Sequence, residues 1–500
     1  MGRRDQGLGR EHDLAAGPGT AGPAVPPRRE GRHGVTTPDV PGPGAAAPGR
    51  PTAPPAGRRA PAHRGATTTP GRDSATVSRR GLFGAGVTAG VAAAGAGLGA
   101  AAGVAGATAA TGVNPFTAAA NGDESIDLSQ SHPFYATTTR QPQGGVRTAP
   151  QRYCVFMTFD MSSTVRTDLQ VLLARWSASI AQLQAGKTVG SVEPAHGDGV
   201  GADTGEALDL GPASLTVTVG LGPGIFDERF GLASKRPARL AAIPTLPSDN
   251  LDRALTGGDL SLQACADDPQ VAYHAVRDLA RMARGTATVR WTVLGFGRAS
   301  AGPDQSTPRN LMGFKDGTRN ITTDEDYDRF VWVDEPGSGA GWMRGGTYQV
   351  VRKIRMNIEI WDADVVSDQQ RVFGRTKVEG APLSGGSEHT TPDFHATGSD
   401  GTTKIDPTSH IALAAHEANG GVKILRRPYN YTDGLNEYGQ LDAGLLFAAY
   451  TNDPEHFTTL QRKLGASDRL NEYVSHIGSG VFAVPPAPRK GSYIGEQLFL

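Results

Sequence analysis

The sequence predicts an α+β fold built from two halves of similar size. The first half has the order strand, helix, strand, strand, helix, strand, which is the order of a ferredoxin-like sandwich. A second series of strand and helix patterns of similar length follows it, and no short internal repeat indicates a solenoid. We therefore expect two ferredoxin-like sandwiches that together form a dimeric α+β barrel.

In the first half, each element follows from the spacing of its apolar residues. The expected strands are residues 153–159, 215–219, 260–265 and 288–295. The expected helices are residues 165–183 and 269–283. The second helix has the clearest start signal, because Asp267 or Asp268 can cap it and Pro269 occupies its first turn.

The second half is less regular. The expected strands are residues 347–358, 422–425 and 445–450, and a helix is expected at residues 455–464. The Gly-, Ser- and Thr-rich interval 382–403 predicts a surface loop.

The N-terminal quarter has a different composition. Residues 1–77 are rich in Gly, Pro, Ala and Arg and contain almost no large apolar side chains, so we expect a disordered extension. Its length is also consistent with a start codon assigned too far upstream. Over the whole chain 49 basic and 50 acidic residues give a net charge of -1, which offers no electrostatic case for binding nucleic acid.

Residues 78–112 have the form of a twin-arginine export signal. Arg79 and Arg80 precede a weakly hydrophobic run rich in Ala and Gly. The run is long enough to span a bilayer, but its low content of Leu, Ile and Phe favours a signal over an anchor. We expect a linker at 113–150, the N-terminal half at 151–312 and the C-terminal half at 313–500.

The two cysteines, Cys154 and Cys265, are too few for a disulfide framework and lack the spacing of a zinc site. We expect each to be a small buried residue, and a single bridge between them stays open.

Four segments carry most of the functional information. They are GFKDGTRN at residues 313–320, SHI at 409–411, LRRPYNY at 425–431 and LDAGLLF at 441–447. Two glycines bracket an aspartate in the first, so its backbone can turn sharply and hold a carboxylate in place. In this order the four segments resemble the haem site of the dye-decolourising peroxidases, in particular the exported subgroup that includes deferrochelatase-type proteins.

The resemblance assigns chemistry to two side chains. Cleaving the O–O bond of hydrogen peroxide needs a base that moves a proton from one oxygen to the other, a role that the resemblance gives to Asp316. It also needs a fixed positive charge, which the resemblance gives to Arg426. Neighbouring strand residues point to opposite faces, so only one of Arg426 and Arg427 should reach the haem pocket.

The resemblance names His410 as the axial ligand of the haem iron. The segment departs from the family pattern at residues 414–417, AAHE, which leaves His416 as a competing ligand. An acid is expected to hydrogen-bond the ligating imidazole, and the sequence does not choose between Asp468 and Glu472.

Further haem contacts are expected from Arg426 and from Gly317, Thr318 and Arg319, which follow the aspartate. Leu445 and Phe447, two apart on one strand face, would line the pocket, although core packing describes them equally well.

The resemblance implies a haem b peroxidase that reduces hydrogen peroxide and oxidises bulky aromatic donors such as dyes or phenols. The haem would be held non-covalently, because the chain has no Cys-x-x-Cys-His. The twin-arginine export machinery would be a partner, and the mature protein would be extracellular, periplasmic or attached to the cell envelope. A homo-oligomer is compatible with the sequence. The alternatives are a deferrochelatase that releases iron from haem and a non-catalytic haem carrier.

Overall fold

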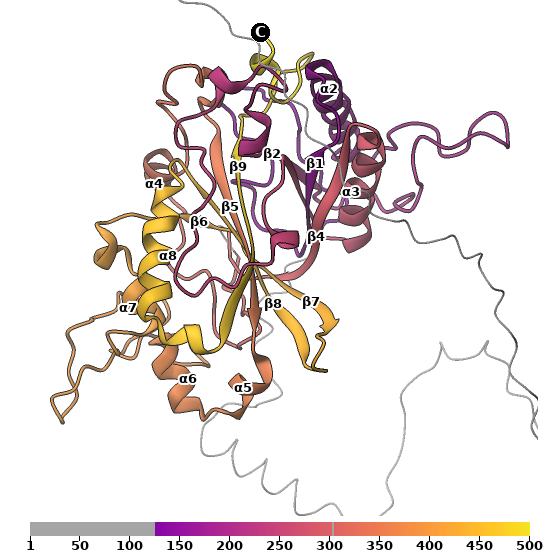
Figure 1. Cartoon of the computed structure of the whole chain (residues 1–500). Helices are drawn as coiled ribbons and strands as arrows, with labels where there is room; N and C mark the ends of the chain where they lie inside the picture. The colour runs from indigo at the N-terminus through magenta and orange to yellow at the C-terminus, as the bar shows by residue number, and fades with distance from the viewer. Residues whose placement is uncertain (1–125, 303–304) are drawn as a thin grey trace, which may run out of the picture. The chain divides into compact units, whose positions relative to one another are not determined.

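The computed structural model describes residues 126–302 and 305–500, and within them nine strands form one antiparallel sheet (Figure 1). The strands are β1 (Tyr153–Met161), β2 (Thr216–Leu221), β3 (Leu260–Ala266), β4 (Ala287–Arg298), β5 (Thr347–Met356), β6 (Leu425–Arg426), β7 (Tyr429–Leu435), β8 (Leu441–Thr451) and β9 (Val474–Val484). Their order is β5-β9-β2-β3-β1-β4-β7-β8-β6. Because β5 also pairs with β8, eight of the strands close into a barrel.

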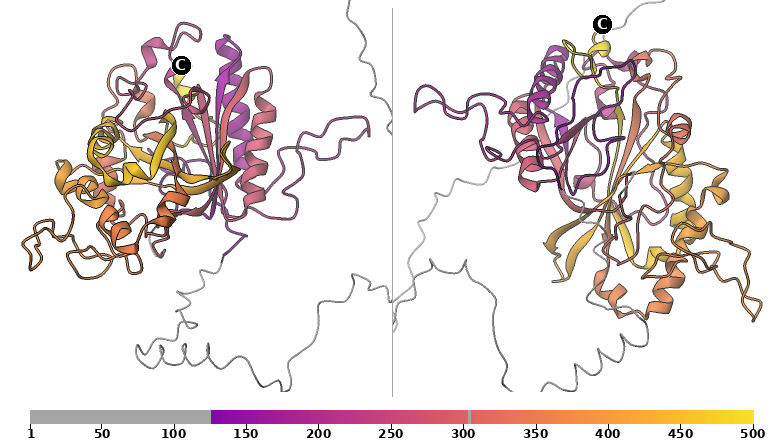
Figure 2. Two further views of the ribbon diagram at one scale, coloured as in Figure 1. Left: turned by 60° about the horizontal axis from the view of Figure 1, so that its bottom comes forward. Right: turned by 180° about the vertical axis from the view of Figure 1, so that it is seen from behind.

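In the first half, the order β1, α2 (Arg166–Leu183), β2, β3, α3 (Pro269–Ala283), β4 confirms the predicted sequence of elements. The start of α3 is set as expected. Asp268 is the N-cap and accepts hydrogen bonds from the backbone N–H groups of Gln270 at 2.7 Å and Val271 at 3.1 Å. The two helices lie side by side against one face of the sheet (Figure 2).

Alternation along the strands sorts their side chains into two cores. In β1, Val155 and Phe159 join the large cluster under α2 and α3, while Cys154 and Phe156 join a second cluster. That second cluster contains side chains from strands all around the barrel, including Tyr429. The barrel is therefore filled by its own side chains and leaves the outer faces for helices.

The second half repeats the arrangement, with β5, β7, β8, α8 (Glu455–Ser467) and β9 in chain order. Shorter helices are inserted: α4 (Asp324–Phe330), α5 (Ile358–Ala363), α6 (Val366–Phe373) and α7 (His410–Ala414). The interval 382–403 contains none of the named helices or strands, as expected for a loop.

Several predicted boundaries in this half are wrong, among them that of the strand expected at 445–450, which is β8 and begins at Leu441. The strand expected at 347–358 ends at Met356, because Ile358 starts α5. The strand expected at 422–425 begins only at Leu425, because residues 422–424 form no ladder with β8. The sequence analysis also gave no strand at β7 or β9.

Cys154 and Cys265 are buried, free and opposite each other in the β1–β3 ladder, so no disulfide joins them. Residues 1–125, which include the extension, the predicted export signal and the start of the linker, lie outside the described residues. Among the helices within 126–302 and 305–500, none combines the length and the apolar character needed to cross a bilayer.

Candidate functional site

A cavity in the C-terminal half collects the predicted site residues. Asp316, Gly317, Thr318, Arg319, His410, His416 and Arg426 all line it. Much of the remaining wall is apolar and comes from strands and from α8: Ile354, Met356, Leu445, Phe447, Phe457, Leu460, Leu464 and Val474. Segments that are about 100 residues apart in the chain therefore meet around one hollow with a polar and an apolar part.

Asp316 lies in a turn that a side chain of the same segment stabilises. Asn310 accepts hydrogen bonds from the backbone N–H groups of Met312 and Phe314 through its side-chain oxygen. Its amide nitrogen donates to Asp316 Oδ2 at 3.1 Å. Phe314 anchors the turn to α6, because its ring stacks on Phe373 with centroids 4.1 Å apart. One asparagine thus fixes both the turn and the carboxylate.

Position 317 requires a glycine, both because of its backbone conformation and because the space beside it is filled. Its φ is +97°, and a Cβ built there would lie 2.8 Å from Ser300 Cα. Arg319 also has a positive φ, +62°, which is uncommon for a residue with a side chain. The turn therefore stores strain beside the predicted catalytic aspartate.

Arg426 contacts this turn from the short strand β6. Its Nη1 lies 3.4 Å from Asp316 Oδ1, and its Nη2 donates to the carbonyl of Thr318 at 2.9 Å. The side chain of Asn320 closes the contact from the other side, because it accepts from Arg426 N and donates to Arg426 O. The guanidinium and the carboxylate are therefore fixed relative to each other.

Arg427 points elsewhere. It is buried, its Nη2 donates to Gln151 Oε1 at 3.1 Å, and it also bonds the carbonyl of Thr148. Only Arg426 of the pair lines the cavity, as strand alternation required.

His410 begins α7, and its ring is oriented by an acid. Its Nδ1 donates to Asp468 Oδ2 at 2.7 Å, while Asp468 Oδ1 accepts from Leu470 N at 2.9 Å. Burial opposes protonation of His410, but the Asp468 carboxylate outweighs it and raises the pKa of His410 above its ordinary value. Of the two acids that the sequence left open, Asp468 makes the contact, and Nε2 is the ring nitrogen left to act as a ligand.

His416 lies near Arg319 in the same cavity. Arg319 Nη2 is 3.3 Å from His416 Nδ1 and also pairs with Glu417. Burial, reinforced by the charge of Arg319, lowers the pKa of His416 below its ordinary value. His416 Nδ1 thus lies beside a cation as well as 3.4 Å from Glu417 Oε2, whereas His410 Nδ1 contacts the Asp468 carboxylate, and the adjacent cation makes His416 the poorer donor to a metal.

Several residues around the cavity were missed by sequence analysis. Asn310 and Asn320 position Asp316 and Arg426. Glu388 pairs with Lys315 and accepts from Thr318 Oγ1 at 3.2 Å. Asn310 and Glu388 lie outside the four segments, Glu388 in the loop predicted only as surface, and Asn320 ends the first segment without a predicted role. These contacts can be identified only from the positions of the residues in the structure.

Two family models together match most of the chain. Residues 143–297 match the family model described as Dyp-type peroxidase, N-terminal, and residues 307–489 match Dyp-type peroxidase, C-terminal.

Individual relatives are matched over most of their own length. A deferrochelatase from Yersinia pestis is 37% identical over 381 residues, which is 74% of this chain and 85% of the relative. Ferric DtpA from Streptomyces lividans is 40% identical with a TM-score of 0.67, and the match covers 74% of this chain and 97% of that one. A DyP-type peroxidase from Streptomyces coelicolor is 37% identical with a TM-score of 0.68, over 75% and 99% of the two chains.

Proposed function

The chain belongs to the Dyp-type peroxidase family, and from this premise we propose that it is a haem b peroxidase that reduces hydrogen peroxide and oxidises bulky aromatic donors such as dyes or phenols. The family implies an oxidoreductase that acts on peroxide. The observation that carries the proposal is that Asp316 and Arg426 are fixed to each other in the same cavity as His410.

The residues of the cavity fit a non-covalently held haem. His410 offers Nε2, since Nδ1 is engaged by Asp468, and this arrangement raises the basicity of a ligating imidazole. The apolar wall, which includes Leu445 and Phe447, suits the flat face of a porphyrin. Gly317, Thr318 and Arg319 would contact the group from the turn that carries Asp316.

When bound, the haem would supply the iron that accepts the peroxide and stores two oxidising equivalents. The chain's own contribution is to move a proton and to stabilise charge. Asp316 would take a proton from one peroxide oxygen and deliver it to the other, which leaves as water. Arg426 would stabilise the negative charge that grows on the leaving oxygen. Asn310 would keep the carboxylate in position for both transfers.

The proposal is tested on protein expressed with ample haem supply. We expect a Soret absorption band, a change of that band on adding hydrogen peroxide, and bleaching of an anthraquinone dye that needs both protein and peroxide. A folded protein that stays colourless under these conditions would overturn the proposal.

The deferrochelatase named among the relatives favours a second candidate function, the release of iron from haem. That activity predicts iron-free porphyrin, detected by its fluorescence, after incubation of the protein with haem. Recovery of unchanged haem removes this function. A pure haem carrier is less well supported, because binding alone requires neither Asp316 nor Arg426.

We also propose that the protein is exported by the twin-arginine machinery and works outside the cytoplasm. The support is the sequence of residues 78–112 alone. Replacing Arg79 and Arg80 by lysine should retain the protein in the cytoplasm, whereas the same change at Arg58 and Arg59 should not. Equal export of both variants, measured by cell fractionation, would contradict this proposal.

A further inference from the structure

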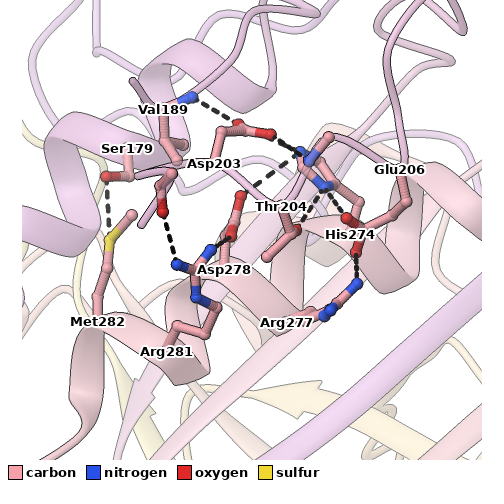
Figure 3. Close-up of polar contacts among 12 residues, drawn as sticks. Ser179, Val189, Asp203, Thr204, Glu206, His274, Arg277, Asp278, Arg281 and Met282 are labelled. Carbon is pink, nitrogen blue, oxygen red and sulfur yellow. Dashed lines mark hydrogen bonds and ion pairs between the residues drawn. The ribbon is translucent and has the colours of Figure 1, made fainter. Parts of the chain in front are cut away.

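A second cluster of ionisable side chains lies in the N-terminal half and shares no residue with the cavity of His410 (Figure 3). His274 and Asp278 are one turn apart on α3, so they share a face of the helix. Asp203 reaches them from the segment between α2 and β2. All three are buried, and their three ligand atoms lie within 4.8 Å of one another.

The distances suit an ion between these atoms better than direct hydrogen bonds. His274 Nε2 is 3.6 Å from Asp203 Oδ2 and 3.6 Å from Asp278 Oδ2. A protonated imidazole would bring its N–H to within about 3.2 Å of an acceptor. Metal–ligand bonds of about 2.0–2.1 Å at tetrahedral angles place neighbouring ligand atoms roughly 3.3–3.4 Å apart. The observed 3.6 Å is closer to the spacing of ligand atoms around a metal ion than to a hydrogen-bond distance.

The other ring nitrogen of His274 faces an acid. Figure 3 shows one nitrogen directed at Asp203 and Asp278 and the other at Thr204 and Glu206. Nδ1 lies 3.2 Å from Glu206 Oε2, which favours the tautomer with the proton on Nδ1 and the lone pair on Nε2. A carboxylate beside the ring nitrogen that does not ligate is typical of metal-binding histidines.

The second oxygen of each aspartate is held by the protein. Asp203 Oδ1 accepts from Gly205 N at 2.7 Å, and Asp278 Oδ1 accepts from Arg281 Nη1 at 3.2 Å. Asp203 Oδ2, the oxygen that faces His274, also accepts from Val189 N at 2.8 Å, which orients the carboxylate (Figure 3). Asp278 Oδ2, in contrast, is buried and has no hydrogen-bond partner among the described residues, although it points into the cluster. A buried carboxylate oxygen is costly when left unsatisfied, and a cation would satisfy it.

From this geometry we propose that Asp203, His274 and Asp278 bind one divalent transition-metal cation, with Zn²⁺ as the best fit. One nitrogen and two oxygens suit Zn²⁺, whereas Ca²⁺ and Mg²⁺ prefer oxygen ligands throughout. Among first-row metals, Mn²⁺ binds sites with nitrogen and oxygen ligands more weakly than Zn²⁺ does. The site is independent of the proposed peroxidase function.

The structure also indicates a role for the ion. Residues 187–206 form a long segment without helix or strand, and Asp203 lies near its end. A cation shared with α3 would fasten this segment to the helix. A hollow lined by Asp203, Thr204 and Arg277 borders the cluster and offers solvent access to it.

Isothermal titration of the chelator-treated, tag-free protein with ZnCl₂ tests the proposal. We expect one saturable Zn²⁺ per chain. His274→Gln and Asp278→Asn should each weaken binding by more than about 100-fold, and Glu206→Gln by about 10- to 100-fold. His196→Gln is the matched control, because it removes an exposed histidine from the same segment and should leave binding unchanged.

Circular dichroism checks that each variant is folded, and limited proteolysis provides a second measurement on the unaltered protein. Zn²⁺ should slow cleavage within residues 187–206. The proposal is overturned if the unaltered protein shows no saturable binding, if folded His274→Gln and Asp278→Asn bind like it, or if Zn²⁺ leaves the cleavage rate unchanged.

Discussion

At the scale of single residues, the contact between Asp316 and Arg426 leads to a kinetic prediction. Asp316→Asn removes the proposed proton carrier and Arg426→Leu removes the charge proposed to stabilise the leaving oxygen, but neither change alters His410. Both variants should load haem normally and react with hydrogen peroxide about 10²- to 10⁴-fold more slowly. Stopped-flow absorbance in the Soret region measures this rate.

Exposed residues of the same types provide controls for this experiment. Asp362→Asn and Arg371→Leu change an exposed aspartate and an exposed arginine, and both should react at the rate of the unaltered protein. If a cavity variant reacts as fast as its control, that residue has no part in the mechanism.

The two histidines of the cavity can be separated by a second pair of variants. His410→Ala should abolish the Soret band, because it removes the nitrogen that Asp468 orients. His416→Ala should keep the band, since His416 contacts Arg319 and Glu417 instead. Haem content per chain is the measurement. Loss of haem only in His416→Ala would transfer the ligand role to that residue.

The sequence predicted the residues of the cavity better than their supports. Asp316, His410 and Arg426 stand in motifs that are continuous in the chain. Asn310 and Glu388 lie outside these motifs, and Asn320 ends the first motif without a predicted role, because their contacts depend on which loops the fold brings together. The choice between Asp468 and Glu472 was open for the same reason, and the backbone after α8 decides it by directing Asp468 to His410.

At the scale of elements, the turn 313–320 must keep its tight packing if it is to hold Asp316. Gly317→Ala would place a Cβ 2.8 Å from Ser300 Cα, in addition to the strain of a positive φ. Gly337 has a similar φ, +83°, but no atom of the part of the chain that the structure describes lies within 4 Å of the added Cβ. Gly337→Ala therefore carries the backbone cost without the clash.

We expect Gly317→Ala to lower the free energy of unfolding by about 1–3 kcal/mol more than Gly337→Ala does. Urea denaturation of the two variants measures the difference. Equal loss of stability would show that the packing against Ser300 relaxes without cost.

The strength of the local sequence pattern explains which helices and strands could be predicted. Strands such as β3 and helices such as α3 have strong apolar spacing or clear caps, so their positions follow from local sequence. Residues 422–424 also read as a strand, but the ladder with β8 starts only at Leu425. β9 was missed because its Ser- and Gly-containing sequence has weak strand propensity, and pairing with β5 along its length stabilises it instead.

At the scale of the whole molecule, a buried ionic group connects the two halves. Arg352 of β5 is fully buried and pairs with Asp249, from the segment before β3, at 2.8 Å. His476 of β9 is buried beside them, and within residues 126–302 and 305–500 its Nδ1 has no hydrogen-bond partner. Burial, together with the charge of Arg352, lowers the pKa of His476 to about 3.

This pKa makes the stability of the folded chain sensitive to acid. Below the ordinary pKa of 6.5 the unfolded chain binds a proton at His476, while the folded chain does not until about pH 3. Stability from this residue is therefore complete above pH 6.5 and is lost as the pH falls toward 3, by up to ~5 kcal/mol. His476→Gln removes the titrating group, so its free energy of unfolding should fall less than that of the unaltered protein between pH 7 and pH 4.

Urea unfolding at several pH values in this range tests the prediction, and groups common to both proteins cancel in the difference. His196→Gln, which changes an exposed histidine, should follow the unaltered protein at every pH. If His476→Gln shows the same acid sensitivity as that control, His476 takes up its proton in the folded state near the ordinary pKa. The buried pair of Arg352 and Asp249 would then have to tolerate a third charge beside it, which burial makes costly.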